Sequence, residues 1–376
     1  MKVTHISAAK GIAGSERHLL TLLPGLRAAG IDVDMIVLGR ADQAVRFVER
    51  LKALGVPVTW LSLTRHLSPG IIAPLVRHFQ DIKPDIVHTH LIHAEIYGTL
   101  AARNARIPHV VTSRHNIDQF RKMIPFRAAS FATWQMVDGG ITISDAVKDF
   151  TLRVEPSSRG KLRTVHYGLH PPPGEPNASS RRAELRKEWG IRLDAPVIGS
   201  ISRLIEQKGL HFGLEAFAQV YKQIPDAHYV IAGDGVLRQE LAEQANRLGL
   251  YESVHFLGWQ DRADELYDGF DVFLMPSLWE GFGLTLLEAM SHHLPIVTTN
   301  VSAMPEIVVE GETGYLVNPA DSQALVEPLI RLLRDRDLSD RMGKAGRARL
   351  ERSFTVEKMV SETIDFYCNI IHGVGS

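Results

Sequence analysis

Short apolar segments alternate with amphipathic helical segments over most of the chain, and this alternation limits its fold more than any other feature. Each apolar segment has the length of a buried strand, and helical patterns such as residues 16–29 and 45–54 lie between them. Strands that alternate with helices form a parallel sheet with helices on both faces. In the first half, the predicted strands are residues 2–7, 33–39, 58–63, 86–90, 109–113, 140–144 and 164–167.

A second series of the same kind follows a proline-rich stretch, residues 170–180. Proline lacks an N–H donor and has a fixed φ, so this stretch is predicted to be a linker rather than part of a core. A charged helix is predicted over residues 181–189. At 376 residues the chain is also long for a single core, so we predict two doubly wound α/β domains. The strands of the second series are predicted at residues 197–202, 228–232, 254–257, 272–275, 296–299 and 314–317.

The composition argues against several classes of protein. Lysine and arginine number 42, and aspartate and glutamate number 43. The chain therefore lacks the net positive charge that is typical of nucleic-acid-binding proteins. The single cysteine, Cys368, excludes an internal disulfide framework and a multi-cysteine zinc site and fits a reducing compartment. No apolar run approaches the length of a membrane span, and residues 1–6 read as a strand rather than a signal peptide. We therefore expect a soluble, cytoplasmic protein.

The most informative local segment contains a strand, a glycine-bearing loop and a helix within residues 272–290. The helix that begins at Leu284 is apolar on almost every side and is therefore predicted to be buried. Glu288 in this helix and Glu280 just before it need partners, because a buried carboxylate is costly unless it is paired or hydrogen-bonded. The free N–H groups of the first helical turn form an anion site. The segment thus offers donors for a phosphate and acceptors for hydroxyl groups, as a sugar nucleotide requires.

This segment resembles the Glu-x7-Glu motif of the retaining glycosyltransferases of family 4 (glycosyltransferase group 1), which have the GT-B fold. Glu280 and Glu288 have the spacing of the two glutamates, and Gly281, Gly283 and residues 287–290 match the surroundings of the motif. The alternative is a purely structural strand–loop–helix unit in which Glu280 complements the helix dipole. The resemblance favours the glycosyltransferase.

The resemblance implies two Rossmann-like, doubly wound domains that face each other across a cleft. The N-terminal, acceptor-binding domain is expected over residues 1–170, and a linker with an entry helix over residues 171–190. The C-terminal domain, which binds the nucleotide sugar, is expected over residues 191–354. A last helix within residues 355–376 is expected to pack back on the N-terminal domain.

Two cations follow the first strand of the second series. Arg203 and Lys208 can both reach one point in front of a helix predicted to begin near Gly209, and such a pair suits a diphosphate. The pattern resembles the family's Gly-Arg-Leu…Lys-Gly signature, with Ser202 in place of the usual glycine. The alternative is two solvated surface cations.

The resemblance implies further contacts with the donor. Phe282, Leu284 and Thr285 complete the loop and helix start around the two glycines of the motif. Gly258 and Trp259, which follow the third strand of the second series, are expected beside the nucleotide base.

The first strand of the chain is followed by a glycine-bearing turn that opens a helix. This turn resembles the family's first-loop Gly-Gly motif, with Ser15 in place of the second glycine and Gly14 as the residue of close approach. The alternative is a plain strand-to-helix turn with Ser15 as the N-cap.

Histidines lie at the ends of two strands in the first half. By the resemblance, a histidine near the end of the fifth strand contacts the donor sugar or the reacting phosphate, and His115 matches it best. His90 is equally consistent with a histidine of the core. No His-Glu-x-x-His motif or cysteine pair accompanies them, so we predict no metal site.

Residues 118–134 combine cations with large apolar side chains. In relatives with lipid-linked acceptors, such a surface touches the membrane. An ordinary amphipathic helix with its apolar side in the core is the favoured alternative, so contact with the inner face of the membrane is left open.

Together these features predict a metal-independent, retaining glycosyltransferase that uses a nucleotide sugar, preferably a UDP-sugar, as co-substrate and no further cofactor. Its expected acceptor is a hydroxyl group of a cell-envelope or polysaccharide glycan or of a lipid-linked intermediate. The predicted catalytic residues are Glu280, His115, Arg203 and Lys208. The cations and the helix N-terminus would stabilise the leaving diphosphate. Glu288 would bind the ribose hydroxyls, and Glu280 the hydroxyls of the transferred sugar.

Two other classes of protein are alternatives. A non-catalytic GT-B subunit would bind nucleotide or glycan without turnover, and the retained glutamates and cations argue against it. A dinucleotide-dependent oxidoreductase would need Gly-x-Gly-x-x-Gly after the first strand. The chain has only Gly11-x-x-Gly14 at that position.

Overall fold

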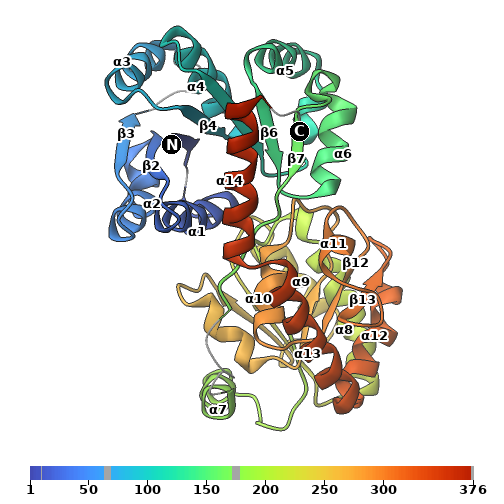
Figure 1. Ribbon diagram of the computed structural model, residues 1–376. Helices are drawn as coiled ribbons and strands as arrows, with labels where there is room; N and C mark the ends of the chain where they lie inside the picture. Colours follow the sequence, from blue (N-terminus) through green and yellow to red (C-terminus); the bar gives the residue numbers. More distant parts are fainter. Residues whose placement is uncertain (10, 63–68, 172–177, 374–376) are drawn as a thin grey trace. The chain divides into compact units, whose positions relative to one another are not determined.

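The computed structural model describes residues 1–9, 11–62, 69–171 and 178–373. The chain divides into two compact units (Figure 1). Unit 1 comprises Met1–Gly168 and Thr355–Ser376, and unit 2 comprises Leu169–Phe354. Each unit is built on one parallel sheet, which confirms the predicted α/β class. Residue 63 of the predicted third strand and residues 172–177 of the predicted linker lie outside the described part of the chain.

The sheet of unit 1 has seven strands in the order β3-β2-β1-β4-β5-β6-β7. The order reverses between β1 and β4, and in doubly wound sheets ligands bind at the carboxyl ends of the two strands at such a reversal. The strands are β1 (Lys2–Ala8), β2 (Asp32–Gly39), β3 (Val58–Ser62), β4 (Ile86–His90), β5 (His109–Arg114), β6 (Gly139–Thr142) and β7 (Leu162–Thr164).

Helices cover both faces of this sheet. One core contains α1 (Gly14–Ala28), α2 (Ala41–Ala53) and α14 (Val356–His372), so the last helix of the chain packs within unit 1 beside α1. The core on the other face contains side chains of α3, α4 and α5. The remaining elements of unit 1 are η1 (Pro69–Ile71), α3 (Ile72–Ile82), α4 (Leu91–Asn104), η2 (Gln119–Lys122), α5 (Ile124–Met136), α6 (Asp145–Val154) and η3 (Pro156–Ser158).

The sheet of unit 2 has six strands in the order β10-β9-β8-β11-β12-β13, and its order reverses between β8 and β11. Its strands are β8 (Val197–Ile201), β9 (His228–Ala232), β10 (Val254–Gly258), β11 (Val272–Met275), β12 (Ile296–Thr299) and β13 (Gly314–Val317). Its helices are α7 (Ala178–Glu188), η4 (Glu206–Lys208), α8 (Leu210–Gln223), α9 (Arg238–Arg247), η5 (Ala263–Gly269), α10 (Leu284–Ser291), α11 (Met304–Ile307), α12 (Ser322–Arg334) and α13 (Arg336–Ser353). Helix α7, predicted as the entry helix, packs against η5 of this unit.

One predicted strand, residues 164–167, is misplaced. Strand β7 spans Leu162–Thr164 and pairs with β6 at the edge of the sheet. The backbone N–H of Val165 still donates to the carbonyl of Thr142, but the chain then leaves the sheet. The alternation of Val165 and Tyr167 resembles that of a strand, but these residues lie beyond β7. The side chain of Tyr167 forms a hydrogen bond to His115.

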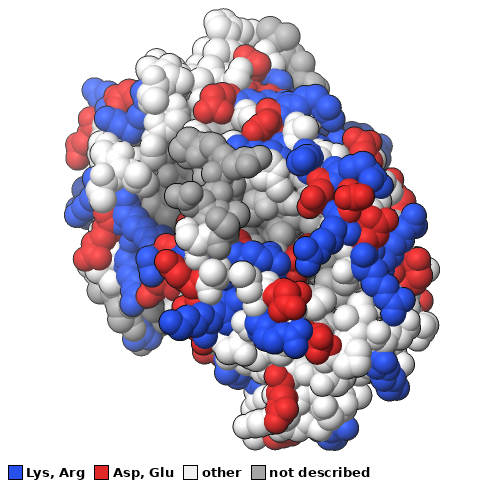
Figure 2. All heavy atoms as spheres, turned by 90° about the horizontal axis from the view of Figure 1, so that it is seen from below, with Lys and Arg blue, Asp and Glu red and all other residues white. Residues whose placement is uncertain are grey.

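The surface mixes charges of both signs. On the face drawn in Figure 2, lysine and arginine side chains are interspersed with aspartate and glutamate among the described residues, in keeping with the balanced composition. Among the described helices, none combines the length and the apolar character needed to cross a membrane.

Candidate functional site

The site in unit 2 lies where the strand order reverses. Residues 202–209 follow β8 and residues 276–283 follow β11, so both loops lie at the carboxyl edge of the sheet. The backbone N–H of Leu278 donates to the carbonyl of Gln207 at 2.8 Å. Gly209 has φ +59°, and a Cβ there would lie 2.1 Å from the carbonyl oxygen of Pro276. Only glycine therefore lets these two loops pack so closely.

Lys208 and Glu280 form an ion pair across the two loops. Glu280 is buried, and the Ser277 hydroxyl donates to the same carboxylate oxygen, Oε1, at 3.0 Å. The backbone N–H of Glu280 donates to Ser302 Oγ at 3.2 Å, which fixes the loop. The buried carboxylate thus has the cationic partner that its burial requires, and its Oε2 makes none of these contacts.

Helix α10 starts directly after this pair. Gly283 is its N-cap, and the side chains of Leu284 and Thr285 in its first turn are half-buried. Phe282 is buried, and its ring packs edge-on against Phe354. The N-terminus of α10 thus follows, three residues on, the glutamate that binds Lys208, and a helix N-terminus suits an anionic ligand.

Glu288, in the second turn of α10, is half-buried rather than fully buried. Its Oε2 accepts a hydrogen bond of 2.7 Å from the hydroxyl of Tyr267 on η5. The second glutamate of the motif is thus oriented by a neighbouring element.

The other predicted donor residues of unit 2 are more dispersed. Arg203 is exposed, and the described contacts do not bring it to the Lys208–Glu280 pair. Gly258 ends β10 at the edge of the sheet. Trp259, the next residue, is 60% exposed, and its indole N–H donates to Asp261.

The Gly-Asp-Gly turn after β9, residues 233–235, packs against the loop of residues 202–209. A Cβ at Gly233 would lie 1.8 Å from the carbonyl oxygen of Ser202, and the carbonyl of Asp234 accepts from the N–H of Leu204. These contacts give the turn a structural role.

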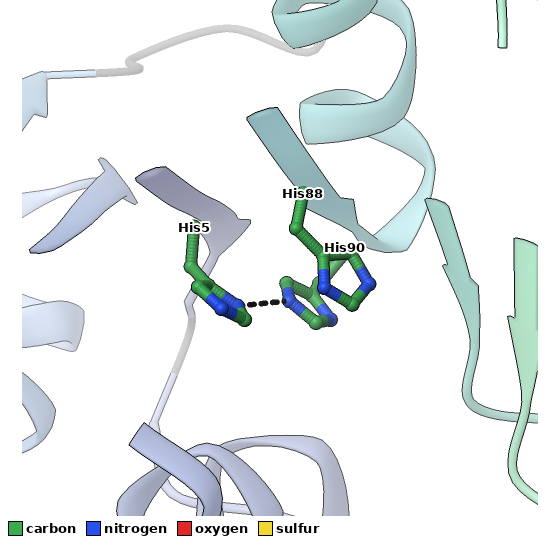
Figure 3. Close-up of side chains that lie close together, drawn as sticks. All are labelled: His5, His88 and His90. Atoms are coloured by element: carbon green, nitrogen blue, oxygen red, sulfur yellow. Dashed lines mark hydrogen bonds between the residues drawn. The ribbon is translucent and has the colours of Figure 1, made fainter. Parts of the chain in front are cut away.

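In unit 1, histidines gather at the reversal of strand order. His5 on β1 is paired in register with His88 on β4, and His90 lies two residues further along β4. Side chains two residues apart on a strand point to the same face, and Figure 3 shows the three imidazoles close together. This face is the one covered by α1 and α14. They are buried, and one ring nitrogen from each lies within 4.8 Å of the others.

These imidazoles are part of a longer hydrogen-bonded series, which we term the histidine chain. Its members come from β1, β4, the end of β5, the segment after β7, and α14. The bonds join Ser113 Oγ to His88 Nε2 (2.7 Å), His88 Nδ1 to the Tyr367 hydroxyl (2.6 Å), this hydroxyl to His5 Nε2 (3.3 Å), His5 Nδ1 to His90 Nε2 (2.9 Å), His90 Nδ1 to His115 Nε2 (2.9 Å) and His115 Nδ1 to the Tyr167 hydroxyl (2.6 Å).

The histidine chain is electrically neutral. Burial lowers the pKa of His5 to about 3, and burial together with Arg114 lowers that of His115 to about 3. Burial and the neighbouring histidines hold the pKa values of His88 and His90 well below the usual value. His18 of α1 is shifted in the same direction and stacks on Tyr167.

The first loop of unit 1 differs from its predicted alternative. Helix α1 begins at Gly14 with Ala13 as N-cap, so the prediction of Ser15 as N-cap is wrong. Ser15 lies inside the first turn, where its hydroxyl donates to Glu16. Glu16 also accepts from the N–H of Ala13 at 3.0 Å. Gly14 is exposed at the start of the helix, which is compatible with a close approach to a ligand.

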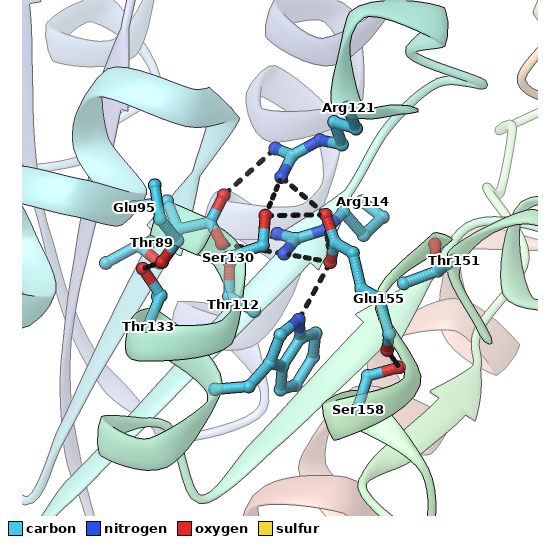
Figure 4. Close-up of polar contacts among 12 residues, drawn as sticks. Thr89, Glu95, Thr112, Arg114, Arg121, Ser130, Thr133, Thr151, Glu155 and Ser158 are labelled. Carbon is cyan, nitrogen blue, oxygen red and sulfur yellow. Dashed lines mark hydrogen bonds and ion pairs between the residues drawn. The ribbon is translucent and has the colours of Figure 1, made fainter. Parts of the chain in front are cut away.

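A charged cluster lies on the opposite face of the same strand end (Figure 4). Arg114 precedes His115 on the chain and therefore points the other way, where it pairs with Glu95 of α4 and with Glu155. Arg121 of η2 binds the same two carboxylates at 2.9 Å each. Trp134 of α5 donates to Glu155 as well. This arginine–glutamate cluster, formed by Arg114, Arg121, Glu95 and Glu155, holds η2 and α5 against the sheet.

Sequence reasoning missed three members of the histidine chain, His5, Tyr167 and Tyr367. His5 could have been found, because it occupies the same strand face as His88 once β1 and β4 are neighbours. Tyr167 and Tyr367 had no usable signal, since the first lay in a predicted strand and the second in a helix of unknown orientation.

Two family models match the chain. The model for glycosyltransferase family 4 covers residues 12–171, and the model for glycosyl transferases group 1 covers residues 181–349. Together they span most of both units.

Two relatives and one solved structure illustrate what the chain is similar to. An Escherichia coli UDP-Gal:alpha-D-GlcNAc-diphosphoundecaprenol alpha-1,3-galactosyltransferase is 25% identical over 99% of this chain and 97% of its own length. A Bacillus anthracis N-acetyl-alpha-D-glucosaminyl L-malate synthase is 33% identical over 50% of this chain and 49% of its own length. The crystal structure of Anabaena HepE in complex with UDP covers 98% of this chain and 100% of that chain, with 22% identity and a TM-score of 0.84, which shows a common fold.

Proposed function

Because the chain belongs to the glycosyltransferases of family 4 (group 1) and has their two-domain GT-B fold, we propose that it transfers a sugar from a UDP-sugar to an acceptor hydroxyl with retention of configuration. The acceptor is a cell-envelope or polysaccharide glycan or a lipid-linked intermediate. The observation that carries this proposal is the Lys208–Glu280 pair beside the N-terminus of α10. It combines a cation, free N–H groups and a carboxylate at the edge where doubly wound sheets bind ligands.

Two kinds of relative support UDP as the nucleotide. The Escherichia coli relative uses UDP-Gal, and HepE has been crystallised with UDP and with UDP-glucose.

The leaving diphosphate is stabilised by positive charge in this proposal. Lys208 is held in place by Glu280 and the first-turn N–H groups by their helix, so in this proposal both donors are preorganised for the charge that develops on the leaving oxygen. The ammonium group of Lys208 has three donors and can keep Glu280 while it binds a phosphate. Exposed Arg203 would move onto the diphosphate from solvent.

The two glutamates accept hydrogen bonds from hydroxyl groups. Glu280 has Oε2 to offer to the transferred sugar, because Lys208 and Ser277 both bind its Oε1. Glu288 is assigned to the ribose hydroxyls, and Tyr267 orients its carboxylate. Gly281, Gly283 and Phe282 shape the loop between them.

Retention follows from attack on the same face of the sugar. The acceptor oxygen forms the new bond to C1 as the bond from C1 to the diphosphate oxygen breaks, and the acceptor proton passes to the departing phosphate oxygen. Glu280 is not proposed as a nucleophile, since the same carboxylate is held by Lys208 and Ser277.

In this proposal, His115 and Gly14 contribute contacts from unit 1. Both ring nitrogens of His115 are bonded within the histidine chain. A hydrogen bond from its ring to the donor sugar or phosphate therefore requires that His115 releases His90 or Tyr167.

The proposed reaction is independent of metal ions, because Lys208, Arg203 and the helix N-terminus supply the charge that a metal would supply elsewhere. We expect turnover to be unchanged in EDTA. Activity that vanishes with EDTA and returns with magnesium or manganese would overturn this part of the mechanism.

A surface of unit 1 suits a lipid-linked acceptor at a membrane. Met123, Ile124 and Phe131 are 56%, 81% and 61% exposed, which is unusual for large apolar side chains. Lys122 and Arg127 lie in the same segment and, with Arg153, line a cavity of about 350 Å³. The arginine–glutamate cluster binds η2 through Arg121 and α5 through Trp134, and it thereby holds this segment in place.

Vesicle binding tests this membrane contact. Ile124→Asp and Phe131→Asp should each reduce co-sedimentation with anionic phospholipid vesicles, whereas Val236→Asp, at an 88% exposed position of unit 2, should not. Equal binding of all three variants would argue against the surface.

The proposed reaction is tested by following the anomeric proton of the product by NMR with a panel of UDP-sugars and hydroxyl acceptors. Retention predicts that the first product has the anomeric configuration of the donor. An inverted first product would contradict the mechanism, and UDP binding without transfer or donor hydrolysis would favour a non-catalytic subunit.

A further inference from the structure

The histidine chain uses every ring nitrogen of four histidines. His88, His5, His90 and His115 each make two hydrogen bonds, and hydroxyl groups lie at both ends and between His88 and His5. A neutral imidazole has one N–H donor and one acceptor nitrogen. Each ring must therefore donate in one direction along the chain and accept from the other.

A metal ion held by His5, His88 and His90 explains the same cluster less well. Two nitrogens on one tetrahedral zinc ion lie about 3.3 Å apart when each Zn–N bond is 2.0–2.1 Å. His5 Nδ1 and His90 Nε2 are only 2.9 Å apart, and their rings are nearly parallel, at 9°. This geometry fits a direct N–H···N hydrogen bond. The nitrogens that could bind a metal are also those that the chain already uses.

Only two arrangements of protons form all six hydrogen bonds while the hydroxyl of Tyr367 both donates and accepts within the chain. In one, protons point from Ser113 towards Tyr167, and all four histidines carry the proton on Nδ1. In the other, protons point from Tyr167 towards Ser113, and all four carry it on Nε2. Between two rings, a mixture sets two donors or two acceptors against each other. Across the buried Tyr367, it leaves either the tyrosine proton without an acceptor or one imidazole nitrogen without a donor, and an unsatisfied buried group is costly. The four tautomers are therefore coupled.

The two ends of the chain select between these arrangements. Ser113 is buried, and among the described residues its hydroxyl has one hydrogen-bond partner, His88 Nε2. Its proton is therefore satisfied only when it donates to His88, which leaves the Tyr167 oxygen at the other end to accept from His115 Nδ1. Burial, and after it the charge of Glu16, raise the pKa of the Tyr167 hydroxyl, so this group is a neutral hydroxyl.

We propose that His88, His5, His90 and His115 share the Nδ1–H tautomer, and that Tyr167 sets this tautomer and is thereby a positioning residue for His115. The Tyr367 hydroxyl of α14 transmits the same polarity to His88. The tautomer decides which nitrogen of His115 donates and which accepts. The four histidines thus act as one unit, although they come from three strands of the sheet.

The proposal is tested by long-range ¹H–¹⁵N spectra of protein labelled in its histidine rings, which distinguish Nδ1–H from Nε2–H. Wild-type protein should show the Nδ1–H pattern for all four rings. Tyr167→Phe removes the terminal acceptor, so all four rings should switch to Nε2–H, His88 included. Tyr97→Phe, at a buried tyrosine on the other face of the sheet, is the matched control and should leave the pattern unchanged. A change at His115 alone, or no change in Tyr167→Phe, would overturn the coupling.

A second variant keeps the proposal testable if Tyr167→Phe does not fold. Tyr367→Phe interrupts the chain between His88 and His5. His88 alone should then switch to Nε2–H and donate to Ser113, while the other three rings keep Nδ1–H. A uniform response of all four rings would overturn the proposed path through Tyr367. Zinc titration of wild-type protein should leave the four ring patterns unchanged, and metal-shifted signals from His5, His88 and His90 would favour a metal site instead.

The effect on turnover rests on the proposed function, in which His115 contacts the donor. Tyr167→Phe should lower kcat about tenfold with little change in UDP binding, because one hydrogen-bond donor of His115 becomes an acceptor. If the rings switch together and kcat is unchanged, the role of His115 in the reaction is wrong while the histidine chain stands. If kcat falls but the four rings do not change tautomer together, the proposed coupling of the histidines is wrong.

Discussion

The two units have the same kind of sheet and the same kind of strand reversal, but they place opposite chemistry at it. At the β1/β4 reversal of unit 1, the strands and the residue after β5 bear neutral imidazoles whose ring nitrogens are bonded to one another. At the β8/β11 reversal of unit 2, the loops bear an ion pair beside a helix N-terminus, with an exposed arginine on the same loop.

This difference shows that the fold supplies a location and that the side chains decide its use. In a neutral network, the donors and acceptors are bonded to one another, so the network has little electrostatic attraction for an anion. A cation beside unsatisfied N–H groups attracts a diphosphate. We therefore propose that the nucleotide binds in unit 2.

Acidification should separate the two units most strongly. The pKa values of His5 and His115 are about 3 in the folded protein and about 6.5 when unfolded, so the unfolded chain binds more protons below pH 6.5. The contribution of these two histidines to the free energy of unfolding is fully present above pH 6.5 and is lost as the pH decreases towards 3. At pH 5 each of these two histidines costs about 2 kcal/mol, and His18, His88 and His90 act in the same direction.

Calorimetry from pH 7.5 to 5, with limited proteolysis to assign the transitions, measures this difference. Unit 2 has the half-exposed pair His228 and His255, whose pKa values are also lowered, so its transition should move less. A transition of unit 2 that moves as far as that of unit 1 would contradict the comparison.

Glu155→Gln should destabilise unit 1 by roughly 3–5 kcal/mol, because it leaves Arg114 and Arg121 buried with one carboxylate fewer. Burial alone would raise the pKa of Glu155, but the two arginines lower it to about 2, so the side chain is charged in the native protein. The matched control is Glu351→Gln, which breaks a more exposed pair with Arg347 on α13 and should cost less than about 0.5 kcal/mol. Urea unfolding compares them, and similar losses would show that the cluster does not hold unit 1 together.

Loss of positive charge in unit 2 should affect turnover. Lys208→Ala should lower kcat by roughly 10²–10³-fold, or about 3–4 kcal/mol, since it removes a preorganised charge from the diphosphate site. Arg203→Ala should also lower kcat, and its unfolding midpoint should be that of wild type because its side chain is exposed. Lys222→Ala, an exposed lysine on α8, is the control. Near-wild-type kcat in both test variants would contradict the assignment of the diphosphate site to this edge of the sheet.

The two glutamates should separate binding from turnover. Glu288→Gln should weaken UDP binding by roughly 1.5–3 kcal/mol, because a charged acceptor for the ribose hydroxyls is lost. Glu280→Gln should bind UDP more nearly as wild type and turn over the intact donor more slowly. Calorimetry with UDP and with the UDP-sugar distinguishes the two stages. Normal UDP binding in Glu288→Gln, together with normal turnover, would return this residue to a structural role beside Tyr267.

Much of the fold follows from the sequence because buried parallel strands are marked by apolar runs. Strands β4, β9, β11, β12 and β13 have the predicted limits. Strand β7 does not, because a three-residue edge strand leaves little apolar pattern and the adjacent alternation continues into a loop.

The candidate site was predictable only in part. The Lys208–Glu280 pair could be expected, since both residues follow strands that become neighbours and a buried carboxylate needs a partner. The exposure of Arg203 could not, because position after a strand does not tell which side chain packs inward. The histidine chain depends on Tyr367, whose approach is set by how α14 packs on the sheet, and local sequence does not contain that information.

The assignment of the nucleotide to unit 2 is tested most directly by hydrogen–deuterium exchange with and without UDP. The account predicts slower exchange on UDP binding in residues 202–209 and 276–290, around Lys208, Glu280 and the start of α10, and no comparable change at the strand ends that carry the histidine chain. Protection confined to the carboxyl ends of β1 and β4, with residues 202–209 and 276–290 unchanged, would contradict it.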